Sequence, residues 1–370
     1  MTYPPNPAIL ADRFKTLRYD PEQDAVILLN RAKYPLETEF VTCETVEDVA
    51  RAVETMIVQG GPPLAYAAGL GLALADRTEP AYRAAAERLL ATRPTADDLH
   101  HIIPAALERA LEALDSGEDP KNAIIDYVNG EIERGNRVSR ACGEYAADLL
   151  ADGDRVLTHC IAGAALCWML WIAKQQGKTI HLIPTETRPY LQGARLTAQC
   201  AVELGIDCTL ITDAMPAHLM SQGMVDKFIC AADRVTMDGH ITNKVGTLQI
   251  AIAAHYHGIP FYVLGYDGPD PHTASADGIE IEWRDGREVL YLAGQRTAVE
   301  GINALYPAFD ITPPHLISAI VTDRGVFPAH LVYNYWKNKL QIIQQPTATL
   351  NQGEPHAPKK AKPRRLRLMR

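Results

Sequence analysis

The fold is decided by the stretch "RVLTHCIAGAALCWMLWIAKQQGKTIHLIPTE", Arg155 to Glu186. An apolar run, RVLTHC, leads into a helical stretch, and a second apolar run, TIHLIPTE, follows. Short apolar runs separated by helical stretches are typical of βαβ units, whose parallel strands are buried on both faces. The pattern repeats downstream in DCTLITD, KFICAADRV and PFYVLG. This part of the chain is therefore predicted to form a doubly wound, Rossmann-like parallel sheet.

The sequence before this stretch has a different period. Up to about Gly153, apolar residues recur at three- and four-residue spacing, which indicates amphipathic helices. The clearest are TVEDVARAVETMIVQ, AYRAAAERLLA, HIIPAALERALEAL and the long stretch beginning NAIIDYVNGEIERG, and a short β segment, AVILLN, precedes them. The sequence thus predicts an α/β protein with a mainly helical N-terminal domain over residues 1–150, a Rossmann-like domain over 151–345, and a tail over 346–370.

Charge is distributed unevenly along the chain. The net charge is −9, yet the tail carries seven Lys and Arg side chains and one Glu, so the body is more acidic than the whole. An acidic body argues against a nucleic-acid-binding domain, and a Pro- and charge-rich tail is typical of disorder. A solubilising tail is favoured, and a basic arm that contacts RNA or a membrane stays open as the alternative.

Other sequence features narrow the class of protein. No run of eighteen apolar residues occurs, and the N-terminus lacks a basic region followed by an apolar core, so we expect a cytoplasmic protein without a membrane span. Seven cysteines lie mostly in apolar segments, which favours reduced thiols over disulfides or a zinc site. No dinucleotide or P-loop signature fits the strands. We expect neither a cofactor nor a metal.

Polar residues follow the predicted strands. His159 and Cys160 end the first strand, Glu186 to Arg188 the second, Asp213 the third, and Asp233 the fourth. In an open α/β sheet the ligand crevice lies at the carboxyl ends of the strands, so these residues are expected to face one cleft.

The stretch "ETRPYLQGARLTA", Glu186 to Ala198, suggests what this cleft binds. A Pro at the start of a helix, outward N–H groups and two arginines favour an anion such as a phosphate. Ordinary surface ion pairs at a helix start are the alternative interpretation.

Six motifs resemble, in order, those of the S-methyl-5-thioribose-1-phosphate isomerase family, which is related to the regulatory subunits of eukaryotic initiation factor 2B. The similarity runs from about residue 15 to about residue 330. The stretch from Glu186 to Ala198 and the TDRGV region are the most specific, and non-catalytic relatives share both in weaker form. The motifs are RPTADDL (93–99), THCIAGA (158–164), ETRPYLQGARLTA (186–198), ITDAMPAHLM (211–220), AADRVTMDGHITNKVGT (231–247) and PAFDITPPHLISAIVTDRGV (307–326).

The resemblance implies an aldose–ketose isomerase that converts S-methyl-5-thioribose 1-phosphate to S-methyl-5-thioribulose 1-phosphate in methionine salvage. Cys160 and Asp233 match the family's catalytic positions. Apolar neighbours are expected to keep Asp233 protonated, as a general acid needs, and a following helix start is expected to lower the pKa of Cys160. The positions that the resemblance assigns to phosphate or substrate binding are Gln59, Gly60, Gly61, Arg93, Gln192, Asn243 and Lys244.

The chain also departs from the family. Gln59 stands where the family has an arginine expected to contact the phosphate, and Ile161 and Ala214 replace asparagines. The family's early Asp-Gln pair is Asn30-Arg31, so Arg31 is a candidate to compensate for Gln59. Losing a charged hydrogen bond costs about 1.5 to 3 kcal/mol, enough to change the preferred substrate.

Three hypotheses therefore stay open: the isomerase itself; an isomerase of a related sugar 1-phosphate, such as 5-deoxyribose 1-phosphate or ribose 1,5-bisphosphate; and a non-catalytic regulatory protein. The family also implies a homodimer through the C-terminal domain, and the apolar segment HLVYNYW, residues 330–336, is a candidate partner surface.

Overall fold

A small antiparallel sheet opens the fold. The computed structural model describes residues 8–337 except 95, 162 and 293. Strands β1 (Leu17–Asp20), β2 (Ala25–Leu29) and β3 (Phe40–Cys43) pair in that order, and every residue of β2 is buried. The sequence predicted only the central strand, because β1 and β3 are short and partly exposed.

Five helices follow and confirm the helical N-terminal part. They are α1 (Val46–Glu54), α2 (Gly61–Leu72), α3 (Glu79–Leu90), α4 (Asp97–Ser116) and α5 (Pro120–Asp148). Thr45 begins α1 with a capping box, in which its side chain and that of Asp48 each accept the other's backbone N–H. Helix α2 is apolar on nearly every side and packs against α4 and α5 in the centre of the bundle.

A seven-stranded sheet with helices forms the second part and confirms the predicted α/β fold. The strand order is β17-β16-β10-β7-β4-β5-β6, and all neighbours are parallel except β16 and β17. The strands are β4 (Arg155–Thr158), β5 (His181–Pro184), β6 (Asp207–Cys208), β7 (Lys227–Ala231), β10 (Phe261–Leu264), β16 (Ala319–Thr322) and β17 (Gly325–Phe327). The helices between them are α6 (Gly163–Gln175), α7 (Ala198–Leu204), α8 (Pro216–Ser221) and α9 (Thr247–Tyr256).

The strand order fixes where a ligand site belongs. From β4 the chain moves outward through β5 to β6, then returns to the other side of β4 with β7 and continues outward through β10 and β16. The direction of winding therefore reverses between β4 and β7. Ligands of open α/β sheets bind at such a switch point, beyond the carboxyl ends of the two strands.

Smaller strands build the walls around that end of the sheet. β8 (Arg234–Val235), β9 (Ile241–Lys244) and β15 (Phe309–Thr312) form an antiparallel sheet in the order β15-β9-β8. Two further hairpin-like pairs join β11 (Trp283–Arg284) to β14 (Tyr306–Pro307) and β12 (Tyr291–Leu292) to β13 (Gln295–Arg296). The sequence analysis did not predict these short strands.

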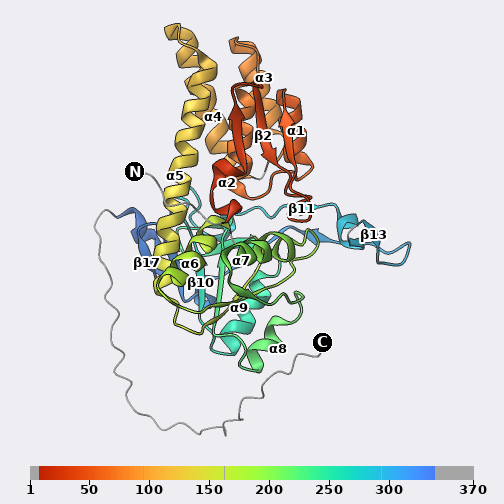
Figure 1. Ribbon diagram of the computed structural model, residues 1–370, viewed down its shortest axis with the longest axis vertical. Helices are drawn as coiled ribbons and strands as arrows, with labels where there is room; N and C mark the ends of the chain where they lie inside the picture. Colours follow the sequence, from red (N-terminus) through yellow and green to blue (C-terminus); the bar gives the residue numbers. More distant parts are fainter. Residues whose placement is uncertain (1–7, 95, 162, 293, 338–370) are drawn as a thin grey trace. The chain divides into compact units, whose positions relative to one another are not determined.

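Helix α5 connects the two parts of the structure. Figure 1 shows α1 to α5 gathered at one end, the sheet at the other, and α5 running from one into the other. Ile124, Val128 and Ile132 lie in the core of the helical part, while Cys142 and Ala146 lie in the core beside the sheet. An added Cβ at Gly143 would lie 2.5 Å from the Cβ of Trp168, so a side chain there would prevent α5 from packing this closely on α6.

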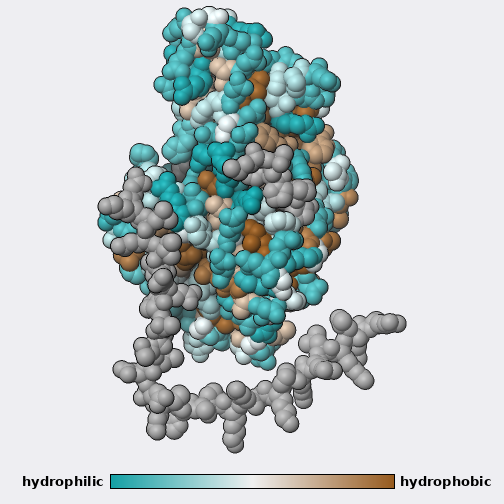
Figure 2. All heavy atoms as spheres, turned by 60° about the vertical axis from the view of Figure 1, so that its left-hand side comes forward, coloured by the Kyte–Doolittle hydropathy of each residue, from teal (hydrophilic) through white to brown (hydrophobic). Residues whose placement is uncertain are grey.

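The surface and the C-terminal segments bear on two further predictions. The face shown in Figure 2 is mostly hydrophilic over its upper part, with more hydrophobic residues lower down. Within the described residues, no helix is both long enough and apolar enough to span a membrane. In the segment HLVYNYW, Val332 and Tyr335 are buried and Trp336 is 45% exposed, and the homodimer stays a prediction. The basic tail, 346–370, lies outside the described residues.

Candidate active site

Cys160 and Asp233 lie at the switch point of the sheet. Cys160 follows β4, and Asp233 follows β7, the two strands between which the winding reverses. Cys160 has a φ of +66°, a region that side chains rarely adopt. Its N–H donates to Thr187 Oγ1 at 2.9 Å and its carbonyl accepts from Thr197 Oγ1 at 2.7 Å. Two threonines of the predicted anion stretch thus hold the backbone of Cys160.

The thiol of Cys160 does not have the lowered pKa that the sequence suggested. Its side chain is buried, and loss of solvation raises its pKa to about 12, against an opposing effect of the nearby Lys244 ammonium. Burial outweighs the helix start because a thiolate loses its water on every side. Cys160 is therefore a neutral thiol near pH 7.

The pKa of Asp233 is shifted in the predicted direction, but not far enough to keep the carboxyl mostly protonated near pH 7. Its carboxyl keeps accessible surface inside the cavity but is surrounded by protein, and this loss of solvation raises its pKa to about 6, although Lys244 and Arg93 oppose the shift. The backbone N–H of Asp233 donates to the carbonyl of Thr242 at 2.8 Å. A carboxyl with this pKa can give and take a proton near neutrality.

Two adjoining chambers meet at these residues. The smaller has a volume of about 150 Å³ and the larger about 570 Å³. Residues of the helical part and of the sheet line both, so Arg93 and Cys160 face one cleft, as predicted. The residues shared by the two chambers are Gly60, Gly61, Asp98, Cys160, Ile161, Asp233 and Arg234.

Lys244 is the strongest anion-binding feature of the smaller chamber. It ends β9, is 6% exposed, and its Nζ lies 4.7 Å from the centre of the Phe309 ring and 3.4 Å from Tyr306 Oη. Among the described residues, no carboxylate lies within ion-pair distance of it. Burial lowers the pKa of Lys244, while Cys160 and Asp233 act in the opposite direction. A buried ammonium without a counter-ion favours an incoming anion.

Arg93 reaches the same chamber but already has a partner. Its Nη2 lies 2.8 Å from Glu282 Oε2, and its Nη1 lies 3.3 Å from Met56 Sδ. Glu282 also pairs with Arg284 at 3.1 Å. Arg93 can bind a phosphate only by sharing its guanidinium with Glu282. Glu282 and Arg284 were missed because the short strands that present them have no strong sequence pattern.

Gln192 and Gln59 also line the smaller chamber. Both side chains are buried, and the Oε1 atom of each lacks a hydrogen-bond partner. The Nε2 of Gln59 donates to the carbonyl of Met56 at 3.0 Å. Buried amides with an unmet hydrogen-bonding atom are suited to a polar ligand.

Gly60 and Gly61 begin α2 and bring a second acid into the site. Gly60 has a φ of +89°, and an added Cβ on Gly61 would lie 2.1 Å from Asp98 Oδ2. Only glycine therefore lets Asp98 approach the start of α2. Burial, together with the carboxylates of Asp267 and Asp233, raises the pKa of Asp98 to about 7. Asp98 belongs to the quoted RPTADDL motif, yet its role depends on a tertiary contact that sequence alone did not reveal.

Asn243 is less available than expected. Its Nδ2 donates to Thr247 Oγ1 at 3.0 Å and lies 3.5 Å from Cys230 Sγ, within the core. The start of the following helix, α9, is also occupied: the Asp310 carboxylate accepts the backbone N–H groups of Gly246 and Leu248. The chain's own carboxylate therefore takes the helix-start N–H groups near Lys244.

In the stretch from Glu186 to Ala198, too, a carboxylate of the chain occupies backbone N–H groups. The Asp213 carboxylate accepts the N–H groups of Thr187 and Arg188, each at 2.8 Å. The Arg195 guanidinium donates to the carbonyls of Tyr190 and Arg31, at 2.7 and 2.6 Å. Most of the stretch therefore supports its own loop, whereas Gln192, which the resemblance assigns to the ligand, lines the chamber.

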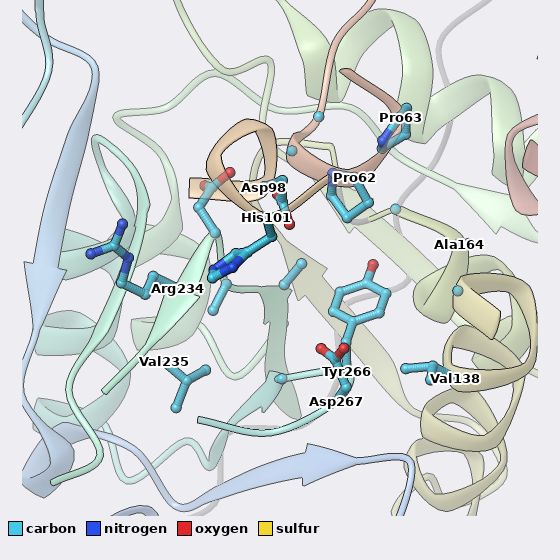
Figure 3. Close-up of a pocket in the computed structure, with 18 of the residues that line it drawn as sticks. Pro62, Pro63, Asp98, His101, Val138, Ala164, Arg234, Val235, Tyr266 and Asp267 are labelled. Carbon is cyan, nitrogen blue, oxygen red and sulfur yellow. The ribbon is translucent and has the colours of Figure 1, made fainter. Parts of the chain in front are cut away.

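The larger chamber lies between the start of α4 and the loop after β10. Figure 3 shows Asp98 and His101 across the chamber from Tyr266 and Asp267. Among the described residues, no cluster of three or more His, Cys, Asp or Glu side chains is arranged to hold a metal ion.

Comparisons with known proteins agree with this architecture. The profile of the Initiation factor 2 subunit family matches residues 68–329. A methylthioribose-1-phosphate isomerase of Pelotomaculum thermopropionicum is 38% identical over 322 residues, covering 81% of this chain and 87% of the relative. One from Xylella fastidiosa is 40% identical over 317 residues, covering 81% and 88%.

The solved structures that resemble this chain include an isomerase and a translation initiation factor. The 5-methylthioribose 1-phosphate isomerase of Pyrococcus horikoshii superposes with a TM-score of 0.75 at 33% identity, covering 87% of this chain and 94% of that one. The translation initiation factor eIF-2B, subunit delta, from A. fulgidus gives 0.70 at 35%, covering 85% and 96%.

Proposed function

The chain belongs to the Initiation factor 2 subunit family, and on that premise we propose that it is an aldose–ketose isomerase of a pentose 1-phosphate. S-methyl-5-thioribose 1-phosphate is the first substrate to test, because relatives at 38 to 40% identity carry that activity in their names. The observation that carries the proposal is the meeting of Cys160, Asp233 and the unpaired Lys244 around one chamber.

Each of these groups has a role in the reaction. Phosphate on the anomeric oxygen prevents spontaneous ring opening, so an acid must protonate the ring oxygen. Asp233 has a pKa of about 6, and the negative charge of a bound phosphate raises that pKa further, so that more of the carboxyl is in the acid form needed to protonate the ring oxygen. Hydrogen then moves from C2 to C1 while the C2 hydroxyl gives its proton to the Asp233 carboxylate, so C2 becomes the carbonyl of the ketose and the composition does not change. Cys160 lies beside Asp233 as the group that assists this transfer.

The phosphate is held by groups that do not react. Lys244 supplies an unpaired charge, Arg93 a guanidinium shared with Glu282, and Gln192 a neutral amide. A related sugar 1-phosphate is the second candidate substrate. Gln59 favours it, because this neutral side chain occupies the chamber where the resemblance leads one to expect an arginine.

The test is turnover of a panel of sugar 1-phosphates by the purified protein, with the ketose 1-phosphate detected by NMR. The panel contains S-methyl-5-thioribose, 5-deoxyribose and ribose 1-phosphates and ribose 1,5-bisphosphate. At least one should be isomerised. Binding of a panel member with no turnover of any would favour the non-catalytic, regulatory interpretation instead.

A further inference from the structure

Two buried arginines of the larger chamber are not used by the proposed reaction. Arg13 is 5% exposed and Arg31 is 4% exposed, and both line the chamber. Neither lines the smaller chamber, where Lys244 and Arg93 lie. Arg31 lies next to the wall between the chambers, because its Nη1 donates to the backbone carbonyl of Gln59, which lines the smaller chamber.

Both guanidinium groups contact only neutral oxygen atoms. Arg13 donates to Asn136 Oδ1 at 3.0 Å and to Ser139 Oγ at 2.9 Å, and its Nε has no partner. Arg31 donates to the Gln59 carbonyl and, at 3.4 Å, to Thr16 Oγ1. Among residues that the structure describes, no carboxylate lies within ion-pair distance of either.

The two arginines are close enough to repel each other. Burial lowers the pKa of Arg31 to about 10, and the charge of Arg13 acts in the same direction. Burying two like charges without a counter-ion is unfavourable unless an anion joins them. An arginine fork is well suited to phosphate oxygens.

Local structure holds Arg31 in this position. Arg195 donates to the carbonyl of Arg31 at 2.6 Å, and the backbone N–H of Arg31 donates to the carbonyl of Ile57 at 2.9 Å. An added Cβ on Gly60 would lie 3.8 Å from Arg31 Nη1, so the guanidinium also lies beside the positive end of the α2 dipole.

Two acidic side chains of the larger chamber form ion pairs with a different arginine, Arg134. Asp267 and Glu131 pair with Arg134, at 2.9 and 2.8 Å. Burial raises the pKa of Asp98 to about 7, although the charge of Arg13 acts in the opposite direction. Asp98 is therefore only partly charged near neutrality. Asp233 and Asp270 also line the chamber, and among the described residues neither forms an ion pair with Arg13 or Arg31.

We propose that Arg13 and Arg31 form a second anion subsite, which binds a phosphomonoester at the C5 end of the sugar. This inference rests on the proposed function, since it takes the first phosphate to lie near Lys244. It selects a pentose 1,5-bisphosphate over substrates with a thioether or a methyl group at C5. A volume of about 570 Å³ is in the range of small-molecule sites.

Three probes separate the two ends of the ligand in calorimetric binding. Ribose 1,5-bisphosphate carries both phosphates, ribose 5-phosphate only the distal one, and 5-deoxyribose 1-phosphate only the proximal one. Wild-type protein should bind the bisphosphate at least about 10-fold more tightly than 5-deoxyribose 1-phosphate, the scale of one charged hydrogen-bonding partner. Equal affinities would overturn the subsite, and this comparison requires no variant.

Variants then assign the effect to residues. Arg31→Gln should weaken ribose 1,5-bisphosphate and ribose 5-phosphate by about 10- to 100-fold, and Arg31→Lys by less. Lys244→Ala should instead weaken 5-deoxyribose 1-phosphate while largely preserving affinity for ribose 5-phosphate. Equal weakening of all three probes by Arg31→Gln would mean that Arg31 serves the first phosphate, which contradicts the proposal.

Turnover distinguishes this inference from the proposed function. Arg31-dependent binding of the bisphosphate with no turnover of any sugar 1-phosphate would leave the subsite standing and remove the isomerase. Isomerisation of 5-deoxyribose 1-phosphate with no preference for the bisphosphate would leave the isomerase standing and remove the subsite.

Discussion

The two chambers differ in whether their buried cationic side chains have carboxylate partners. In the smaller chamber, Lys244 stands unpaired beside Arg93, which a carboxylate already neutralises in part. In the larger chamber, Arg13 and Arg31 both lack a carboxylate partner among the described residues. The smaller chamber holds most residues that the family resemblance marks, whereas Arg31 is a position where the chain departs from it. We therefore expect the wall shared by the two chambers, which carries Cys160 and Asp233, to control the proposed reaction, and the larger chamber to control the choice of sugar.

The shared wall should give the largest effect. Cys160→Ser and Asp233→Asn should each lower kcat by at least about 100-fold, the usual scale for loss of an acid–base group, with ligand binding largely kept. Steady-state isomerisation and calorimetric binding check this. Cys208→Ser is the matched control, because Cys208 lines neither chamber. Unchanged turnover in both site variants would show that a different pair of residues reacts.

The smaller chamber should control binding of the first phosphate. Lys244→Ala and Arg93→Ala should weaken binding of a sugar 1-phosphate by about 1.5 to 3 kcal/mol. Lys244→Ala should have the larger effect because, among the described residues, no carboxylate pairs with Lys244, whereas Arg93 shares its charge with Glu282. Calorimetry with 5-deoxyribose 1-phosphate measures both. A larger loss for Arg93→Ala would contradict this ranking.

The acid on the shared wall predicts a pH dependence. Burial raises the pKa of Asp233 to about 6, so its acid form persists to higher pH than usual and is lost as the pH rises through 6. Above that point kcat/KM should fall about 10-fold per pH unit. Glu282→Gln should shift the break to lower pH, because the Glu282 charge raises the pKa of Asp233. A pH profile that stays flat from pH 5 to 8 would argue against Asp233 as the acid.

Restoring an arginine in the smaller chamber should have a smaller effect. Gln59→Arg should improve kcat/KM for S-methyl-5-thioribose 1-phosphate by less than about 10-fold, because one charged contact is regained while the buried Arg31 nearby opposes a second cation. Gln59→Met is the control for side-chain length without charge. An equal gain in both variants would assign the effect to packing.

The predicted homodimer can be tested by measuring the mass of the protein in solution. Light scattering at micromolar concentration should give twice the mass of the chain. A monomer throughout that range would contradict the dimer.

The positions of the two candidate catalytic residues could be predicted because strand ends are local features, whereas their catalytic roles came from the family resemblance. Cys160 and Asp233 each follow a buried apolar run, and the sheet brings those two ends together. The pKa of Cys160 was predicted in the wrong direction, because burial from surrounding elements outweighs a nearby helix start. The N–H groups near residue 187 were expected to be available to an anion, yet the Asp213 carboxylate, distant in sequence, accepts them.

The burial of Arg31 is another feature that the sequence alone could not predict. In the sequence it is an ordinary charged residue after a strand, and only the packing of α2 and of the loop held by Arg195 shows that it is buried. The residue ranges predicted for the two domains stay a prediction. The described residues cluster as one compact unit that includes both parts.

Helix α5 has a consequence for how this protein loses its structure. It is a single helix of 29 residues whose first half packs in one hydrophobic core and whose second half packs in the other. Neither core can melt without exposing the apolar face of a helix that the other core still needs. Heating should therefore give one transition, in which calorimetric and van't Hoff enthalpies agree. Gly143→Leu, which would force α5 away from α6, should split that transition in two.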